Sequence, residues 1–148
     1  MEATPASVDV RPVVDSDEVE QALELRKEVF CGEQGVDLSA ERDGRDGEAL
    51  HLVAVEDGAV VGTCRLVFDG DLALLGRLVV ARELRRRGIA SSLLREATRR
   101  SAENGARRIS LHAQLSARAL YVEDGYVECG EPFVEEGIDH VAMEKAIA

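Results

Sequence analysis

The sequence predicts an α+β (mixed α/β) fold, in which helices flank a central mixed, mostly antiparallel sheet. Tight-turn signals at Asp57-Gly58 and Asp69-Gly70-Asp71 separate three apolar segments of strand length, which indicates three consecutive antiparallel strands. A long segment of helical period then leads to a fourth strand of this series. Because a helix makes that connection, the strands on either side of it should lie parallel.

Length and composition favour one domain. The chain has 148 residues, 45% of them hydrophobic, which suffices for one sizeable core and is too little for two ordinary domains. We expect a single domain over residues 1–148, with about the first seven residues forming a flexible N-terminus. No apolar run approaches the roughly 20 residues of a membrane span, and the N-terminal segment does not resemble a signal peptide. These features predict a cytoplasmic protein without a membrane partner.

Charge and cysteine content argue against other classes. The formal net charge of −11 disfavours general binding of nucleic acid, whose phosphates would be repelled except at a local basic patch. The positive charge is concentrated between Arg77 and Arg108. Cys31, Cys64 and Cys129 lie far apart without CxxC spacing, so we expect neither a disulfide framework nor a metal site.

The N-terminal segment is expected to form a strand followed by a helix. Val8 to Val14 is rich in valine and predicts the strand. Asp15 and Glu18 stand three residues apart, as in a capping box, and this marks the helix start. The helix is supported by apolar residues at helical spacing, namely Val19, Leu23, Leu25, Val29 and Phe30.

The next segment predicts a loop and the antiparallel strands. Cys31 to Asp46 is charged and contains glycine, so we expect a loop with room for one helical turn. Ala49 to Glu56 and Val60 to Phe68 should form a hairpin, and a further strand begins at Leu74.

The C-terminal third predicts a strand, a short helix and two more strands. Arg108 to Ala113 alternates and follows a helix stop at Asn104-Gly105. Ser116 is expected to cap a short helix that ends before Gly125. The last two strands are expected at Tyr126 to Phe133 and His140 to Ala146.

The stretch from Leu74 to Ala102 has the features of an anion site. It begins as a buried strand, passes through an arginine-rich turn and enters a helix at Gly88, where the sequence changes to helical period. The first amides of a helix lack intrahelical partners and carry the positive end of the helix dipole, so a phosphate group binds well there. The helix stripe consists of Ile89, Leu93, Leu94 and Ala97.

The spacing Arg85-x-x-Gly88-x-Ala90 resembles the acetyl-CoA signature of the GNAT N-acetyltransferases, Gln/Arg-x-x-Gly-x-Gly/Ala. In that family a valine and a leucine precede the motif on the fourth strand, where Val80 and Leu78 stand here. The alternative is an ordinary turn with solvated arginines. The resemblance implies a GNAT fold with CoA between two splayed parallel strands. It implies cofactor contacts from Leu78, Val79, Val80, Arg85, Arg86, Arg87, Gly88, Ile89, Ala90 and Ser91.

A second stretch, Leu111 to Tyr126, resembles the other GNAT signature, Asn-x-x-Ala-x-x-Phe/Leu-Tyr followed by Gly-Phe/Tyr. Gln114 takes the usual Asn place and Ala117 that of the small residue, which implies further contacts to the cofactor. Tyr121 takes the place of the tyrosine that protonates the departing CoA thiolate. A phenol, with a pKa of about 10, is protonated at neutral pH and can donate to sulfur. The alternative is a tyrosine that packs on the core.

A third resemblance covers nearly the whole chain. The segment Arg26 to Val36, the acidic residues Glu41, Asp43 and Asp46, and the final strands are similar to ElaA-like and related small bacterial GNAT proteins. The order of the expected elements is also that of the GNAT fold. A ferredoxin-like or other α+β sandwich is the alternative. The resemblance implies that the loop after the first helix and the final strands surround the acceptor.

An amine acceptor must lose a proton, so a carboxylate or imidazole should face the acetyl group. The candidates are Glu33, His112 and His140, with Glu135 as a weaker one. Each also has a structural interpretation, Glu33 as a solvated loop charge and the histidines as hydrogen-bonded residues of the sheet. His51 is assigned to a structural role.

The expected function is acetyl transfer from acetyl-CoA to a primary amine of a small molecule or peptide by direct attack, without a metal or nucleic acid. Backbone N–H groups near Leu78 or Val80 would polarise the thioester carbonyl. The protein would act as a monomer or homodimer. The alternative function is a non-catalytic acyl-CoA-binding sensor or scaffold.

Overall fold

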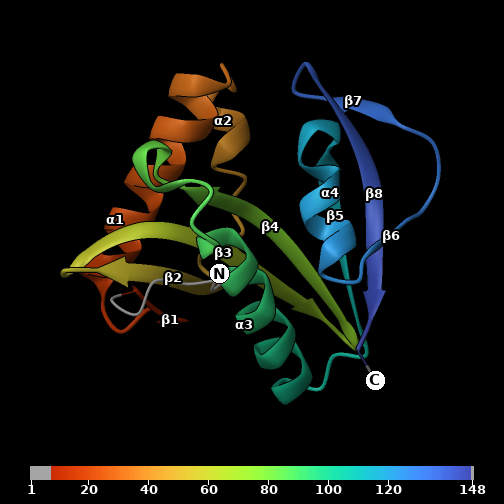
Figure 1. Ribbon diagram of the computed structural model, residues 1–148, viewed down its shortest axis with the longest axis horizontal. Helices are drawn as coiled ribbons and strands as arrows, with labels where there is room; N and C mark the ends of the chain where they lie inside the picture. Colours follow the sequence, from red (N-terminus) through yellow and green to blue (C-terminus); the bar gives the residue numbers. More distant parts are fainter. Residues whose placement is uncertain (1–7, 148) are drawn as a thin grey trace.

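The computed structural model describes residues 8–147, which form an eight-stranded sheet between helices (Figure 1). The prediction for the first seven residues lies outside this range. The strand order is β1-β2-β3-β4-β5-β8-β6, with β7 also paired to β8. The strands are β1 (Val8–Pro12), β2 (Leu50–Glu56), β3 (Ala59–Asp69), β4 (Leu72–Val80), β5 (Arg108–Gln114), β6 (Val127–Glu128), β7 (Phe133–Glu135) and β8 (Ile138–Ala146).

Helices cover both faces of the sheet. They are α1 (Ser16–Arg26), the π-helix η1 (Lys27–Glu33), α2 (Leu38–Glu41), the 3₁₀ turn η2 (Arg82–Leu84), α3 (Ile89–Glu103), the 3₁₀ turn η3 (Leu115–Ala117) and α4 (Arg118–Glu123). Neighbouring residues on β4 point to opposite faces: Val79 packs with Leu25 and Val29 of the α1–η1 side, whereas Val80 belongs to the core beneath α3. No helix within residues 8–147 is long and apolar enough to cross a membrane.

The start of α1 confirms Asp15 as the helix cap and differs from the expected box. The Asp15 carboxylate accepts a hydrogen bond from the backbone N–H of Glu18 at 2.9 Å. The Glu18 carboxylate accepts from the N–H of Val14 instead of that of Asp15, and it also receives both terminal nitrogens of Arg11 at 2.8 Å. Glu18 therefore ties β1 to α1 as well as closing the helix end.

The central hairpins confirm the turn signals. β2 pairs with β3 and β3 with β4, both antiparallel, and the turns fall at Asp57-Gly58 and after Asp69. β5 lies parallel to β4, as the intervening helix required. The predicted stripe of α3, from Ile89 to Ala97, is buried. At Gly62 a Cβ atom would lie 3.1 Å from side-chain atoms of Ile89 and Leu93, so glycine permits α3 to lie close against β3.

The C-terminal third corrects two predictions. Ser116 does not cap α4: the cap residue is Ala117, without a side-chain hydrogen bond, because the chain first makes the 3₁₀ turn η3. The single strand expected at Tyr126 to Phe133 is instead divided into β6 and β7. Gly130 adopts a left-handed conformation (φ 98°) and Pro132 has no N–H to donate, so the ladder cannot continue through this segment.

Other boundaries differ by smaller amounts. The first strand ends at Pro12, two residues earlier than expected, and the loop expected from Cys31 begins with the last residues of η1. The single helical turn expected within that loop is α2. Cys64 is buried in the core, and burial raises the pKa of its thiol to about 12.

The Arg11–Glu18 pair makes stability depend on acid pH. Hydrogen bonding to Arg11 lowers the pKa of Glu18 to about 2, below the value of about 4.3 for an unfolded glutamate. The stabilising contribution should therefore be complete above pH 4.5 and lost as the pH falls toward 2. We expect Glu18→Gln to lower the melting temperature at pH 7 and to reduce its fall between pH 4.5 and 2. Glu103→Gln, on the exposed end of α3, is the control; equal pH curves for wild type and Glu18→Gln would contradict the prediction.

Candidate active site

The site is built on a gap between β4 and β5. The two strands pair only over Leu72–Leu74 and Arg108–Ser110, whereas β4 continues to Val80 and β5 to Gln114. Figure 1 shows the strands beginning side by side and separating toward their carboxyl ends. The two facing edges are thus left without a partner strand where they diverge.

A cavity of about 800 Å³ occupies this gap. One wall is formed by η1, β4 and the segment 34–46 around α2, which we call the α2 loop. The other wall is formed by β5, α4 and the β7–β8 hairpin. The turn before α3 lines one part of the cavity, and polar side chains of β5, β7 and β8 line another. The cavity includes these predicted residues: Leu78, Val79, Val80, Arg85, Arg86, Gly88, Ile89, Ala90, Ser91, His112, Gln114, Ala117, Tyr121, Glu135 and His140.

β4 contains a bulge at the cavity. Arg65 pairs with Gly76 and Thr63 with Val79, so the single residue between them on β3 faces two residues on β4, Arg77 and Leu78. Beyond the bulge, the N–H of Ala81 donates to Val61 O at 2.8 Å. Because amide directions alternate along a strand, the N–H and C=O of Val80 point away from β3, toward the side from which β5 has separated.

The turn before α3 lines the cavity, and the first amides of the helix have no acceptor within α3. Arg86 and Gly88 have left-handed backbones, with φ of 67° and 83°, and Gly88 is the cap residue of α3. The N–H of Ser92 is the first to bond back along the helix, to Gly88 O at 3.1 Å. The amides of Ile89, Ala90 and Ser91 precede it and therefore have no acceptor within α3. This backbone geometry is compatible with the predicted anion site.

The three arginines of this turn point in different directions. Arg86 lines the cavity. Arg85 donates from both terminal nitrogens to the Glu33 carboxylate, at 2.9 and 3.0 Å, and from Nε to Val80 O. Arg87 pairs with Glu56 at 3.0 Å and is not among the residues that line the cavity.

Glu33, like Arg87, is not among the residues that line the cavity. Its hydrogen bonds to Arg85 lower the pKa of the Glu33 carboxyl. A lowered pKa makes a carboxylate a weaker base, so this position fits an ion-pair partner better than a proton acceptor.

Tyr121 lies on α4 against the cavity and is 9% exposed. Its ring meets that of Tyr126 edge-on, with centroids 5.9 Å apart. Burial raises the pKa of the Tyr121 phenol well above its usual value, so the hydroxyl stays protonated at neutral pH. On the same wall as α4, the Gln114 side-chain amide donates across the gap to Gln34 Oε1 at 2.8 Å, which links β5 to the end of η1.

Two histidines face the cavity from the C-terminal strands. His140 is buried, and its Nδ1 lies 2.7 Å from Ile138 O; a carbonyl only accepts, so Nδ1 carries the proton and Nε2 of the neutral ring is free to accept one. The side chain of His112 is 55% exposed, with Nδ1 2.9 Å from Glu135 Oε1. Phe133 stacks on His140 and meets His112 edge-on.

His51 has the structural position expected of it. The residue is buried on β2, and its Nε2 lies 2.9 Å from Asp46 O. It thereby supports the loop that follows α2.

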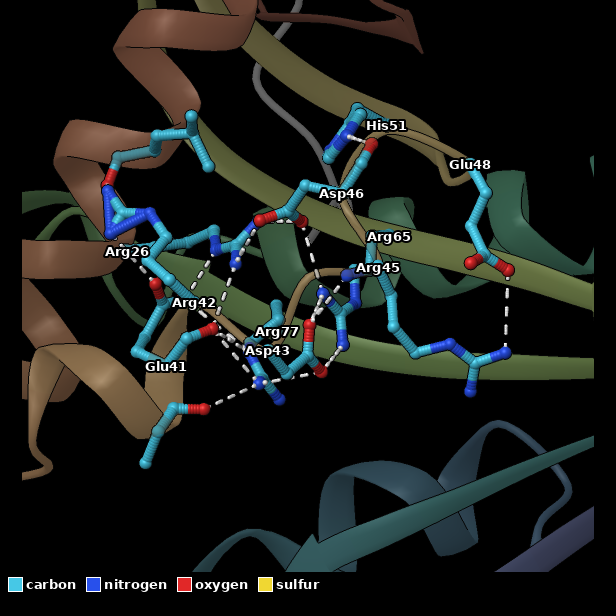
Figure 2. A network of polar contacts seen from close by, with 12 residues as sticks. Arg26, Glu41, Arg42, Asp43, Arg45, Asp46, Glu48, His51, Arg65 and Arg77 are labelled. Carbon is cyan, nitrogen blue, oxygen red and sulfur yellow. Dashed lines mark hydrogen bonds and ion pairs between the residues drawn. The ribbon is translucent and has the colours of Figure 1, made fainter.

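A network of charged residues braces the wall formed by the α2 loop, and residue-by-residue reasoning missed it (Figure 2). Arg26 and Glu41 are both almost fully buried and pair at 2.5 Å, and Arg26 also holds Asp46. The network continues to Arg65 of β3, Asp43 and Arg77 of β4. One sequence signal was available: Arg26 falls on the buried stripe of α1, between Ala22 and Val29, where an arginine needs an acidic partner.

Comparison with known proteins places this chain in a family. Residues 14–147 match the model of the acetyltransferase (GNAT) domain. A UPF0039 protein of Mycobacterium tuberculosis is 35% identical over 137 residues, covering 88% of this chain and 85% of that protein. The uncharacterized N-acetyltransferase YjcF of Bacillus subtilis is 29% identical over 132 residues, covering 88% and 94%.

Solved structures agree. An acyl-CoA N-acyltransferase from Pseudomonas aeruginosa superposes with a TM-score of 0.84 at 29% identity, covering 95% of this chain and 100% of the other. Escherichia coli ElaA gives 0.82 at 21% identity, covering 93% and 97%. An aminoglycoside 6′-N-acetyltransferase complexed with coenzyme A gives 0.77 at 16% identity, covering 95% and 97%.

The fold and the gap between its parallel strands define an acetyltransferase of the GNAT type. The chain belongs to the GNAT N-acetyltransferase family, and it resembles the small bacterial members, ElaA among them. The ferredoxin-like alternative is thereby excluded.

Proposed function

We propose that this protein transfers an acetyl group from acetyl-CoA to a primary amine of a small molecule or peptide by direct attack. The observation that carries the proposal is the continuity of one cavity from the anion-binding turn before α3 to the histidines of the C-terminal strands. A donor and an acceptor that enter from these two parts would meet between β4 and β5. The CoA complex of the related aminoglycoside acetyltransferase supports CoA as the donor's carrier.

The donor would bind along β4. Its pyrophosphate would accept hydrogen bonds from the amides of Ile89 to Ser91, with Arg86 beside it. Arg85 pairs with Glu33 at the surface, where an ion pair is worth about 0–1 kcal/mol, so its guanidinium can turn to a phosphate. Arg87 is itself partly exposed and would leave Glu56 to do the same. Leu78, Val79 and Val80 would border the pantetheine arm, with Gln114 and Ala117 opposite.

The chemistry then needs three groups. An N–H of Leu78 or Val80 would hold the thioester oxygen as negative charge develops on it. The neutral amine would attack the carbonyl carbon, forming the C–N bond, and the C–S bond would break as the intermediate collapses. Tyr121 would give its proton to the departing sulfur, and a base would take the proton that the amine loses.

For the base we propose His140. Its Nδ1–H is fixed by Ile138 O, which leaves Nε2 as the acceptor on a buried ring at the cavity. The His112–Glu135 pair is the second candidate, and it is more exposed to solvent. Glu33 is the third, although its ion pair with Arg85 makes it less suitable than either histidine.

The direct test is to supply acetyl-CoA with a panel of primary amines and to follow the release of free thiol. We expect amine-dependent release that is saturable in both substrates. If calorimetry shows that the protein binds acetyl-CoA and no amine increases thiol release, the alternative function as a non-catalytic sensor or scaffold is favoured instead.

The anion site can be tested with matched glycines at the two ends of α3. Gly88→Glu should abolish CoA binding, because the side chain places bulk and negative charge where the pyrophosphate would sit. Gly105→Glu is the control, since Gly105 has a similar φ (86° against 83°) and no atoms within 4 Å of an added Cβ. Calorimetry on both folded variants decides the matter; equal CoA affinities would remove the turn from the site.

The Tyr121 hydroxyl can be deleted without loss of its ring. Tyr121→Phe should lower kcat by roughly 10- to 100-fold, at the low end for a general acid because thiolate leaves readily, with little change in acetyl-CoA affinity. Because burial raises the pKa of this phenol, the wild-type rate should show no fall from its ionisation below about pH 10. Full kcat in Tyr121→Phe, with chemistry rate-limiting, would show that this hydroxyl is not the acid.

The base can be assigned with matched asparagine variants. His140→Asn keeps a donor near Ile138 O and removes Nε2, so we expect kcat at pH 7 to fall about 100-fold or more. His112→Asn and Glu33→Gln should each change kcat by less than about threefold, and all three variants should bind acetyl-CoA normally. A large loss in His112→Asn alone would reassign the base to the His112–Glu135 pair.

A further inference from the structure

Arg77 has an unusual backbone for a non-glycine residue in a strand. It lies in the bulge of β4 with a φ of 58°, in the left-handed region that side-chain-bearing residues rarely adopt. Gly76 stands next to it in the chain and does not take the left-handed position. An interaction with the surrounding structure must therefore hold this conformation.

The side chain of Arg77 supplies that interaction. Its guanidinium donates to Glu41 O, at 3.1 Å from Nη2 and 3.3 Å from Nε, and to Asp43 Oδ2 at 3.2 Å. It also reaches Ala40 O at 3.4 Å. Ala40 and Glu41 are the last residues of α2, so Arg77 binds the carbonyl end of that helix, where a cation is favoured. We call these contacts the Arg77 clamp.

The acceptors of the clamp are themselves fixed. Asp43 also receives two hydrogen bonds from Arg65 of β3, and the Glu41 carboxylate is bound to the buried Arg26. Asp46 accepts from both Arg26 and Arg65 and closes the network (Figure 2). The clamp is thus anchored to α1 and β3 through the residues that follow α2.

The bulge decides which amides face the cavity. Side chains and amides alternate with a period of two along a strand, so one extra residue reverses the alternation for every residue beyond it. With the bulge, the N–H of Val80 points away from β3, as the bond from Ala81 N to Val61 O requires. Without the bulge, the same N–H would turn toward β3 and leave the cavity.

We propose that Arg77 is a positioning residue of the acetyl transfer: its clamp on Asp43 and the end of α2 maintains the β4 bulge that directs backbone N–H groups at the thioester carbonyl. This inference rests on the proposed function. Arg77 acts through the backbone of β4. A planar fork that binds several oxygens suits the role, and lysine offers no such geometry.

The test separates the backbone from the side chain. Arg77→Gly and Arg77→Ala both remove the clamp, but only glycine adopts the left-handed φ easily. Arg77→Lys keeps the positive charge without the planar guanidinium. Arg99→Ala is the control, because this exposed arginine pairs only with Glu96 and Glu103 on α3 within the described chain. Folding is checked by circular dichroism and thermal melts.

Two readouts are measured for each variant. The first is kcat and KM for the most active amine, together with acetyl-CoA affinity by calorimetry. The second is the infrared carbonyl stretch of bound ¹³C-labelled acetyl-CoA without an amine, which reports polarisation by backbone N–H groups and does not depend on turnover. A merely structural role would lower the melting temperature and leave this stretch unchanged.

We expect Arg77→Gly to lower kcat about 10- to 100-fold, Arg77→Ala to lower it further and Arg77→Lys to be intermediate, with acetyl-CoA affinity within about threefold. The bound carbonyl stretch should move toward its solution value in the same order.

The positioning role is wrong if wild type shifts the carbonyl stretch of bound acetyl-CoA and the folded variants show the same stretch and the same kcat as wild type. In that case the proposed function stands. If Arg77→Gly does not fold, Arg77→Lys decides in the same way. If wild type itself does not bind acetyl-CoA, the proposed function fails and this inference with it.

Discussion

The incomplete pairing of β4 with β5 is the constraint on which the rest of the structure depends. Three residue pairs hold the strands together at their amino ends, and beyond Leu74 and Ser110 the facing backbone edges have no partner strand. A gap in a sheet would close or fill unless both sides were rigid. On one side the Arg26–Glu41 network ties α1, the α2 loop and the strands together, and on the other a seven-pair ladder joins β5 to β8. The cavity exists because each wall is held by its own contacts and the two walls are joined only by the three residue pairs between β4 and β5.

The arginines of this acidic protein fall into two physical groups around that cavity. In the first, Arg26 and Glu41 are each 1% exposed, and removing one partner would leave a buried charge, so these pairs are fixed parts of the wall. In the second, Arg85 and Glu33 are 39% and 30% exposed, and water screens their attraction. Pairs of the second kind can exchange a carboxylate for a phosphate at little free-energy cost. The same residue type thus stabilises the wall where it is buried, and in the proposed function it would serve as an adaptable anion contact where it is exposed to water.

Local sequence signals predicted the parts of this molecule that local physics determines. The Asp57-Gly58 turn gave the hairpin, the stripe of α3 gave its buried face, and Gly88 marked the helix entrance. The failures involve contacts that are distant in the chain. Nothing near Arg77 predicts a bulge, because the oxygens that hold it lie 36 residues away on α2. Likewise, Arg85 and Arg87 stand two residues apart in one stretch of sequence but point in different directions. Arg85 pairs with Glu33 of η1, whereas Arg87 pairs with Glu56 of β2. Even the division of the strand expected at Tyr126 to Phe133 was readable only from Gly130 and Pro132, whose effect outweighed the apolar pattern.

The position of the cysteines bears on the order of the chemical steps. A relay through an acyl-enzyme would require a nucleophile in the cavity, and a cysteine thiolate is the side chain best suited to accept an acyl group from a thioester. Cys64 is buried in the core with its pKa raised to about 12, so its thiol is both inaccessible and protonated. Cys31 and Cys129, like Cys64, are absent from the residues that line the cavity. What the cavity does offer is a single continuous space lined by β4 on one side and by His112 of β5 and His140 of β8 on the other. Such an arrangement would hold two substrates against each other, and it favours the proposed direct attack by the amine over transfer through the protein.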